Sequence, residues 1–148
     1  MKLDDAFQGV SSLAFDTAPI IYFVEANPTY DQLVTDIFNR VAAGELVGWT
    51  SVISLSEVLV QPIVLGRKDL QDQYRELLLN SANFHTLPIT ADVAENAARI
   101  RGAYGLRLPD AIQLAFAINA GCQAILCNDR GMEKVTELKV LILDDLEL

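Results

Sequence analysis

The chain has 148 residues, and 51% of them are hydrophobic. This length suits a single domain, taken as residues 1–148, and this composition supplies a buried core and excludes intrinsic disorder. Eleven basic residues against 20 acidic ones give a formal net charge of −9, which argues against broad binding to nucleic-acid phosphates or to an anionic membrane. No segment resembles a signal peptide or a membrane span, so we expect a cytoplasmic protein.

The first third of the chain predicts a strand followed by two helices. Residues 1–12 are expected to be a loose N-terminal lead-in. The stretch "SLAFDT", residues 12–17, predicts a short strand that ends at Asp16. A first helix follows it, and Asn27 is expected to cap a second helix that Gly44 ends.

The next segment predicts a second strand and a capped helix. Residues 46–52, "LVGWTSV", have the apolar character of a strand, and residues 54–66 predict a helix. Ser54 with Glu57 three residues later matches a capping box, in which both side chains bond to the first helical turn. Pro62 is expected to kink or end this helix.

Helices and strands continue to alternate in the rest of the chain. Helices are predicted over residues 68–82, 90–105, 106–121 and near 131–135, and strands over 84–89, 124–127 and 139–144. The apolar runs "LAF", "AILC" and "VLIL" lack the alternation of a sheet with one wet face. They indicate an α/β fold in which a mostly parallel sheet is covered on both faces.

Four acidic residues stand where such a fold places its ligands. Asp16 ends the first strand, Asp129 follows the strand "AILC", and Glu57 and Asp110 lie near the starts of two helices. The carboxyl ends of parallel strands meet at one edge of the sheet, and sites form there where the strand order reverses. We therefore predict that these four carboxylates share one crevice.

Clustered carboxylates repel one another and raise each other's pKa, unless they hold a cation. Oxygen ligands with open positions suit Mg²⁺ or Mn²⁺, and such an ion can activate a water for attack on a phosphate and absorb the developing charge. His85 is the only histidine, so a zinc site or a serine triad lacks its parts. The pattern predicts metal-dependent hydrolysis of a phosphodiester.

Four motifs make the resemblance specific: "FDTAPIIYFVE", "TSVISLSEVLV", "LRLPDAIQLAFAINAG" and "AILCNDRGM". From about residue 13 to the end, the chain resembles PIN-domain ribonucleases of the bacterial VapC toxin type. The resemblance implies a three-layer α/β/α sandwich, Mg²⁺- or Mn²⁺-dependent cleavage of single-stranded RNA, a cognate antitoxin and, by analogy, a homodimer. It assigns catalysis and metal binding to Asp16, Glu57, Asp110 and Asp129, and a supporting role to Thr17 and Asn128.

The few basic and aromatic residues near the acids are candidates for substrate contacts. Arg107 and Arg130 can hold RNA phosphates, or they can pair with local acids as fixed counter-charges. Tyr22 and Tyr30 can stack on bases. The crevice is also expected to accept an arginine or lysine of the antitoxin.

Less specific interpretations stay open for the same residues. Each acid can be an ordinary turn or helix-cap residue. The chain can be a degenerate PIN domain that binds a protein partner and no longer cuts, an alternative that its acidity favours. A metal site of this kind can equally act on DNA or flap structures, because it need not recognise a 2′-hydroxyl.

Overall fold

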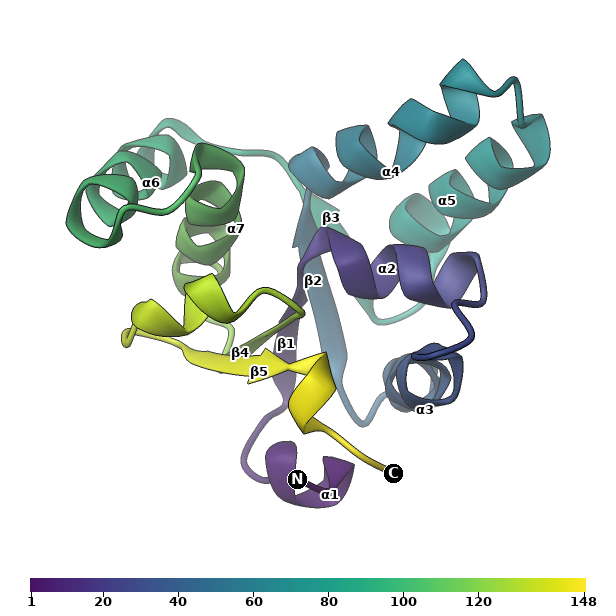
Figure 1. Ribbon diagram of the computed structural model, residues 1–148, viewed down its shortest axis with the longest axis horizontal. Coiled ribbons are helices and arrows are strands. Elements are labelled where there is room, and N and C mark those ends of the chain that lie inside the picture. Colours follow the sequence, from purple (N-terminus) through teal and green to yellow (C-terminus); the bar gives the residue numbers. More distant parts are fainter.

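The computed structural model describes residues 1–148 as a five-stranded sheet between helices (Figure 1). The strands are β1 (Ser12–Phe15), β2 (Val47–Ser51), β3 (Phe84–Leu87), β4 (Ala124–Cys127) and β5 (Lys139–Ile142). The helices are α1 (Leu3–Ala6), α2 (Thr17–Val24), α3 (Asp31–Ala42), α4 (Val52–Val64), α5 (Lys68–Asn80), α6 (Ala91–Tyr104) and α7 (Leu108–Asn119). Two 3-10 turns, η1 (Arg130–Lys134) and η2 (Leu143–Asp145), flank β5.

The sheet is wound in two directions from β1. Its strand order is β3-β2-β1-β4-β5, and all four pairings are parallel. The chain moves from β1 outward to β3, then returns to place β4 on the other side of β1. Right-handed crossovers then put α2–α5 on one face and α6 and α7 on the other, as Figure 1 shows. The predicted three-layer α/β/α architecture is confirmed, and the reversal of strand order lies between β1 and β4.

Side chains along the central strands alternate between two cores. Leu13 and Phe15 pack on the side of α2–α5, and Ala14 packs on the side of α7. In β4, Leu126 and Ile125 divide in the same way. Because both faces are covered, the strands carry continuous apolar runs, which is why they showed no period of two in the sequence.

Gly48 in β2 is required by close packing. A Cβ atom at this position would lie 2.5 Å from Cδ2 of Phe84 and 3.2 Å from Cε1 of Phe15. The two rings pack over the glycine with their centroids 5.4 Å apart. The absence of a side chain at Gly48 therefore leaves room for the rings of Phe15 and Phe84 to pack against β2.

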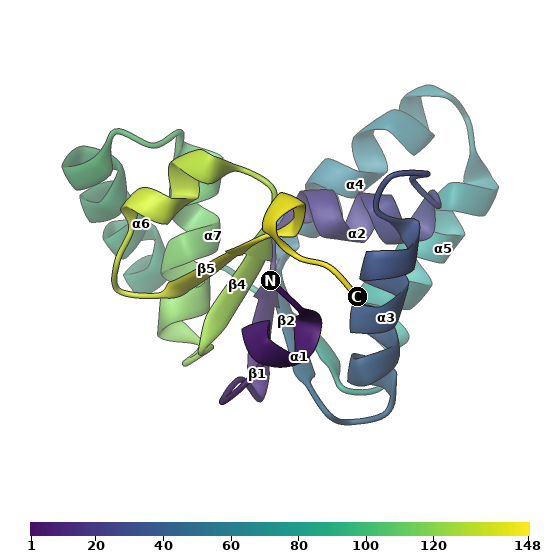
Figure 2. The same cartoon turned by 60° about the horizontal axis from the view of Figure 1, so that its bottom comes forward.

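The expectation of a loose N-terminal lead-in was wrong. Residues 3–6 form helix α1, and Leu3, Ala6 and Phe7 are buried. The amide of Leu3 donates to the carbonyl oxygen of Glu147 at 2.9 Å, so the first residues lie beside the C-terminal segment (Figure 2). Burial of three apolar side chains outweighs the weak helix signal of such a short segment.

Two predicted helix starts were also wrong. The second helix begins at Asp31, and Asn27 instead accepts a hydrogen bond from the backbone N–H of Thr29. Helix α4 begins at Val52, because the hydroxyl of Ser51 accepts from the N–H of Ile53. Competing caps a few residues apart look alike in sequence, and only packing selects one.

The correction at Ser51 matters for the site. Ser54 is not a cap but a fully buried residue inside α4, and Glu57 lies in the second helical turn. The predicted capping box therefore does not form. Pro62, which was expected to kink or end the helix, does not end it at once, because α4 continues to Val64.

Other predicted boundaries are confirmed. The hydroxyl of Thr90 accepts from the N–H of Val93 at the start of α6, and Gly105 ends that helix with φ +71°.

No helix combines the length and the apolar character needed to cross a bilayer.

Candidate functional site

The four predicted acids come from four different elements and border one cleft. Asp16 directly follows β1 and stands at the N-cap position of α2 without a side-chain cap bond, and Asp129 follows β4 and caps η1. Glu57 lies on α4, and Asp110 lies in the first turn of α7. All four line a cleft of about 280 Å³ at the edge where the strand order reverses, as the sequence predicted.

The rest of the cleft lining mixes polar and apolar side chains. It consists of Thr17, Ala18, Ile21, Tyr22, Arg107 and Asn128. The two residues expected to support metal ligands, Thr17 and Asn128, are thus in place beside the acids. The cleft contains four carboxylates and one guanidinium, so its formal charge is strongly negative.

The environment of the cleft raises the pKa of Asp16. Partial burial, followed by repulsion from Asp110 and Glu57, raises its pKa from 3.8 to about 6. The backbone N–H of Thr17 and the amide of Gln113 act in the opposite direction. A carboxylate whose ionisation is opposed by burial and by two neighbouring carboxylates is typical of a site that binds a cation.

The other acids are each held by a partner from the chain itself. Oε1 of Glu57 accepts from the hydroxyl of Thr17 at 2.8 Å. Oδ2 of Asp110 lies 3.2 Å from Nε of Arg107, and Oδ1 of Asp129 accepts from the N–H of Gly131 at 2.9 Å. No three of the carboxylates form a group tight enough to hold a metal ion.

The donor set nevertheless suits a hard divalent cation. It offers carboxylate oxygens together with the hydroxyl of Thr17 and the amide of Asn128, and it contains no sulfur or imidazole. The raised pKa of Asp16 supplies a further reason for an ion to bind, because a cation would favour the ionised form. The residues fit Mg²⁺ or Mn²⁺ in kind and charge, and Arg107 competes with an ion for Asp110.

A buried chain of hydrogen bonds, which the sequence did not reveal, supports the site. The hydroxyl of Ser51 donates to Oε1 of Gln113, and the Gln113 amide donates to Ser54, each at 2.7 Å. Ser54 lies 3.0 Å from the hydroxyl of Thr17, which donates to Glu57. Since Thr17 has one hydroxyl hydrogen, Ser54 must be the donor in their contact.

This chain of hydrogen bonds links α7, α4 and α2 under the floor of the cleft. Ser51, Ser54 and Gln113 are almost completely buried. A signal did exist in the sequence, because Gln113 is the one polar residue in the run "AIQLAFA", most of which is buried around α7. A lone amide on an apolar helix face requires buried partners.

Asn128 is held by hydrogen bonds to residues that do not line the cleft. Its amide donates to the hydroxyl of Tyr30 at 2.9 Å, and its carbonyl accepts from the N–H of Asp144 at 3.2 Å. Tyr30 in turn donates to Oδ1 of Asp144 at 2.5 Å. The segment after β5 therefore holds the residue that precedes Asp129.

The two arginines predicted to contact RNA differ in position. Arg107 lines the cleft, and its side chain is 79% exposed while it pairs with Asp110. Arg130 does not line the cleft, because its guanidinium is held by Asp145 through contacts of 3.0 and 2.7 Å. The structure brings only Arg107 to the acids, in the role of a counter-charge.

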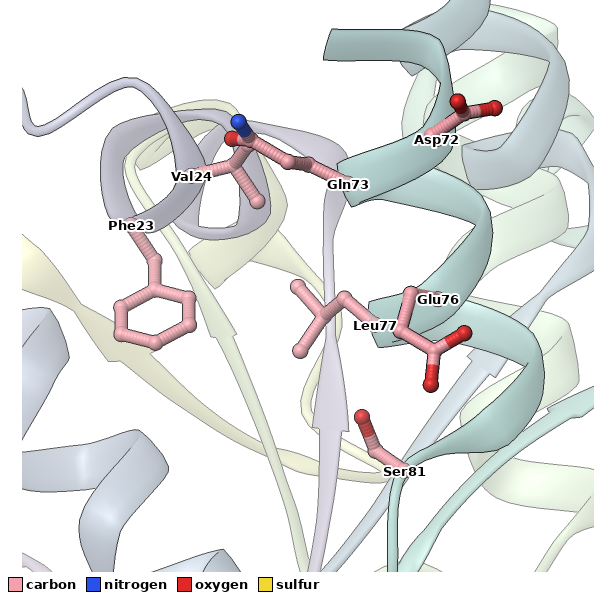
Figure 3. Close-up of a pocket in the computed structure, with 7 residues that line it drawn as sticks. All are labelled: Phe23, Val24, Asp72, Gln73, Glu76, Leu77 and Ser81. Atoms are coloured by element: carbon pink, nitrogen blue, oxygen red, sulfur yellow. The ribbon is translucent and has the colours of Figure 1, made fainter. Parts of the chain in front are cut away.

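The largest cavity lies elsewhere. It has a volume of about 690 Å³ and lies between α2 and α5, where Phe23 and Leu77 point toward each other (Figure 3). Asp72 and Glu76 contribute carboxylates from α5, but none of the four cleft acids reaches it. All four candidate acids therefore lie in the smaller cleft.

One protein family matches the sequence. The sequence model of the family described as "PIN domain" matches residues 13–138. No curated protein has a matching sequence. The matched residues include all four acids of the cleft.

Solved structures share the fold at low sequence identity. VapBC2 from Rickettsia felis, bound to a promoter DNA fragment, aligns with a TM-score of 0.71 at 13% identity, over 88% of this chain and 98% of that chain. A toxin–antitoxin complex from Klebsiella pneumoniae aligns with 0.66 at 23% identity, over 88% and 97%. VapC20 from Mycobacterium tuberculosis, described as a toxin that cleaves the sarcin–ricin loop, aligns with 0.68 at 16% identity, over 86% and 98%.

Proposed function

The chain belongs to the PIN domain family, and from this premise we propose that it is a divalent-metal-dependent endoribonuclease, the toxin of a toxin–antitoxin pair. One observation carries the proposal: Asp16, Glu57, Asp110 and Asp129 come from distant parts of the chain and border the same cleft. Such a set of oxygen ligands has its use in metal-assisted hydrolysis of phosphodiesters.

The roles of the residues follow from their positions. The four acids would hold Mg²⁺ or Mn²⁺, which supplies positive charge to the phosphate and readies a water for in-line attack. Thr17 orients Glu57 through its hydroxyl, and Asn128 holds the backbone that leads into Asp129. These two residues support ligands and need not touch the ion.

We propose single-stranded RNA as the substrate. Arg107 is the only basic residue in the cleft, and its exposed guanidinium makes one hydrogen bond to Asp110. A phosphate can take over that guanidinium without breaking a buried contact. The choice of RNA rests on the family and on similar toxins such as VapC20, described as cleaving the sarcin–ricin loop.

Cleavage of a pool of single-stranded RNA in Mg²⁺ or Mn²⁺ tests the proposal. The Asp16→Asn protein is expected to lose cleavage, whereas Asp72→Asn is expected to keep it. Asp72 is the matched control because it lies on α5, outside the cleft, with a side chain that is 78% exposed. Equal activity of the Asp16→Asn and unsubstituted proteins would reject the assigned site. A parallel single-stranded DNA pool shows whether the substrate was wrong instead.

A second function, protein binding without catalysis, has one observation in its favour. In this structure, no three carboxylates are grouped tightly enough to hold an ion, and Arg107 occupies Asp110. Calorimetry with Mn²⁺ separates the two functions. Binding at millimolar Mn²⁺ that disappears in Asp16→Asn supports the nuclease, and the absence of binding supports the protein-binding module.

We propose that the protein partner is an antitoxin that inserts an arginine or lysine into the cleft. The Arg107–Asp110 pair supports this, since it shows that the cleft accepts a guanidinium. Structures of similar chains have been solved as toxin–antitoxin complexes. Co-expression with the neighbouring open reading frame, followed by pull-down, tests the idea. A partner that binds the Asp110→Ala protein as tightly as the unsubstituted one would contradict the insertion.

A homodimer is the second part of the proposed assembly. The large apolar side chains exposed on and after the C-terminal half of α4 support it: Val60, Ile63, Val64 and Leu65 are each more than half exposed. Light scattering is expected to give twice the monomer mass, and Ile63→Lys is expected to give monomers. Leu79→Lys on α5 is the control, because Leu79 is 53% exposed but lies outside this group. We place the active assembly in the cytoplasm.

A further inference from the structure

Tyr22 is the one aromatic residue that lines the cleft, and the proposed reaction gives it no role. It lies on α2, six residues after Asp16, and is partly buried. Its hydroxyl makes no hydrogen bond within the protein and is not buried away from solvent. The phenol edge of Tyr22 therefore reaches water at the cleft.

The ring of Tyr22 is held in place by a second tyrosine. Its centroid lies 4.4 Å from that of Tyr30, and the two planes differ by 13°, a stacked arrangement. Offset stacks of this kind are favourable and fix the orientation of both rings. One face of Tyr22 is thus occupied by Tyr30 and part of the residue packs against the core, while its remaining surface lines the cleft.

Tyr30 is in turn fixed by the cleft. Its hydroxyl donates to Asp144 and accepts from the amide of Asn128, which itself lines the cleft. The hydrogen bond to Asp144 raises the pKa of Tyr30, because the carboxylate favours the protonated phenol. A continuous set of contacts therefore runs from Asn128 through Tyr30 to Tyr22.

We propose that Tyr22 is the platform on which a nucleobase of the bound RNA stacks, next to the phosphate held at the acids. This inference rests on the proposed function and adds a base-binding subsite to it. A ring already stacked on Tyr30 loses little freedom when a base extends the stack, which favours binding. Stacking on aromatic side chains tolerates any base, so Tyr22 contributes affinity and position more than sequence preference.

The test measures binding without cleavage. The protein carries Asp16→Asn, and the probe is a randomised single-stranded RNA 12-mer in which fluorescent 2-aminopurine replaces adenine. Anisotropy of an end label reports affinity, and quenching of 2-aminopurine reports stacking. Tyr22→Leu is expected to weaken binding by roughly 5- to 150-fold and to remove the quenching, and Tyr22→Phe is expected to preserve both.

Tyr104→Leu serves as the matched control. Tyr104 is also partly buried, but it lies on α6, and its hydroxyl pairs with Glu137 outside the cleft. Unchanged affinity and quenching in Tyr22→Leu would overturn the base platform and leave the nuclease intact. Unquenched 2-aminopurine in the RNA complex that retains Tyr22 would overturn it as well, even if Tyr22→Leu fails to fold. No RNA binding together with no cleavage by the unsubstituted protein would remove the proposed function itself.

Discussion

Replacing Asp16 by asparagine is expected to stabilise the cation-free protein at neutral pH. Partial burial and the neighbouring acids raise the pKa of Asp16 from 3.8 to about 6. A carboxyl with a raised pKa in the folded state contributes stability that is present below its unfolded pKa and is lost as the pH rises through its folded pKa. Above pH 6 the ionised Asp16 therefore opposes folding, and an uncharged asparagine does not.

The size of this effect follows from the same pKa values. A pKa increase from 3.8 to about 6 corresponds to roughly 3 kcal/mol at about 1.36 kcal/mol per unit of pKa. The Asp16→Asn protein should gain up to this amount at pH 8 and roughly half of it at pH 5, with the gain vanishing near pH 3.5. For a chain of this length, the gain at pH 8 should raise the melting temperature by about 6–12 °C.

The measurement is urea unfolding of both proteins between pH 4 and pH 8 in the presence of EDTA. Asp72→Asn removes the same unit of charge from an exposed position and therefore corrects for the relief of the net charge of −9. Adding Mn²⁺ at pH 7.5 is expected to stabilise the unsubstituted protein more than Asp16→Asn. A loss of stability in Asp16→Asn at pH 8, or a gain that does not depend on pH, would refute the reasoning.

Three further substitutions examine packing and the environment of the acids. Gly48→Ala should destabilise the protein by about 1–3 kcal/mol because the new methyl group meets the ring of Phe84. The control, Gly102→Ala, has nothing within 4 Å of its added methyl group and should stabilise the protein by up to about 1 kcal/mol. Equal melting temperatures of the two variants would contradict this view. Gln113→Leu should cost about 2–4 kcal/mol in urea unfolding, because it leaves two buried serine hydroxyls short of a partner; a neutral change would show that these hydroxyls find other partners. Arg107→Ala should raise the calorimetric affinity for Mn²⁺ several-fold by removing a competing cation, and a weaker affinity would show that the guanidinium supports the ion site.

Much of the fold could be predicted because its local signals agree with its global arrangement. Thr90 and Gly105 have strong cap chemistry and mark α6 at both ends. The start of α4 was misplaced because Ser51 and Ser54 are both acceptable caps, and the choice between them depends on the distant Gln113. Helix α1 was missed because its stability comes from burial against the rest of the fold, which no local pattern shows.

The site was predictable in its members but not in their contacts. Strand ends in a parallel sheet share an edge, so Asp16 and Asp129 could be paired without knowing the structure. The different positions of Arg107 and Arg130 could not be predicted. Arg107 precedes Asp110 and Arg130 follows Asp129, so both arginines are near an acid of the site in the sequence. Asp145, which pairs with Arg130, is brought there only by the turn after β5.

The arrangement of the acids shows how the chain itself offsets part of the charge of a cleft so rich in carboxylates. Three of them are stabilised by a hydroxyl, a guanidinium and a backbone N–H from the chain. The remaining carboxylate, on Asp16, has a raised pKa instead. A cation therefore competes with ready partners for three ligands, while at Asp16 it relieves an unfavourable charge. We expect Asp16 to provide most of the driving force for ion binding and Arg107 to provide most of the resistance.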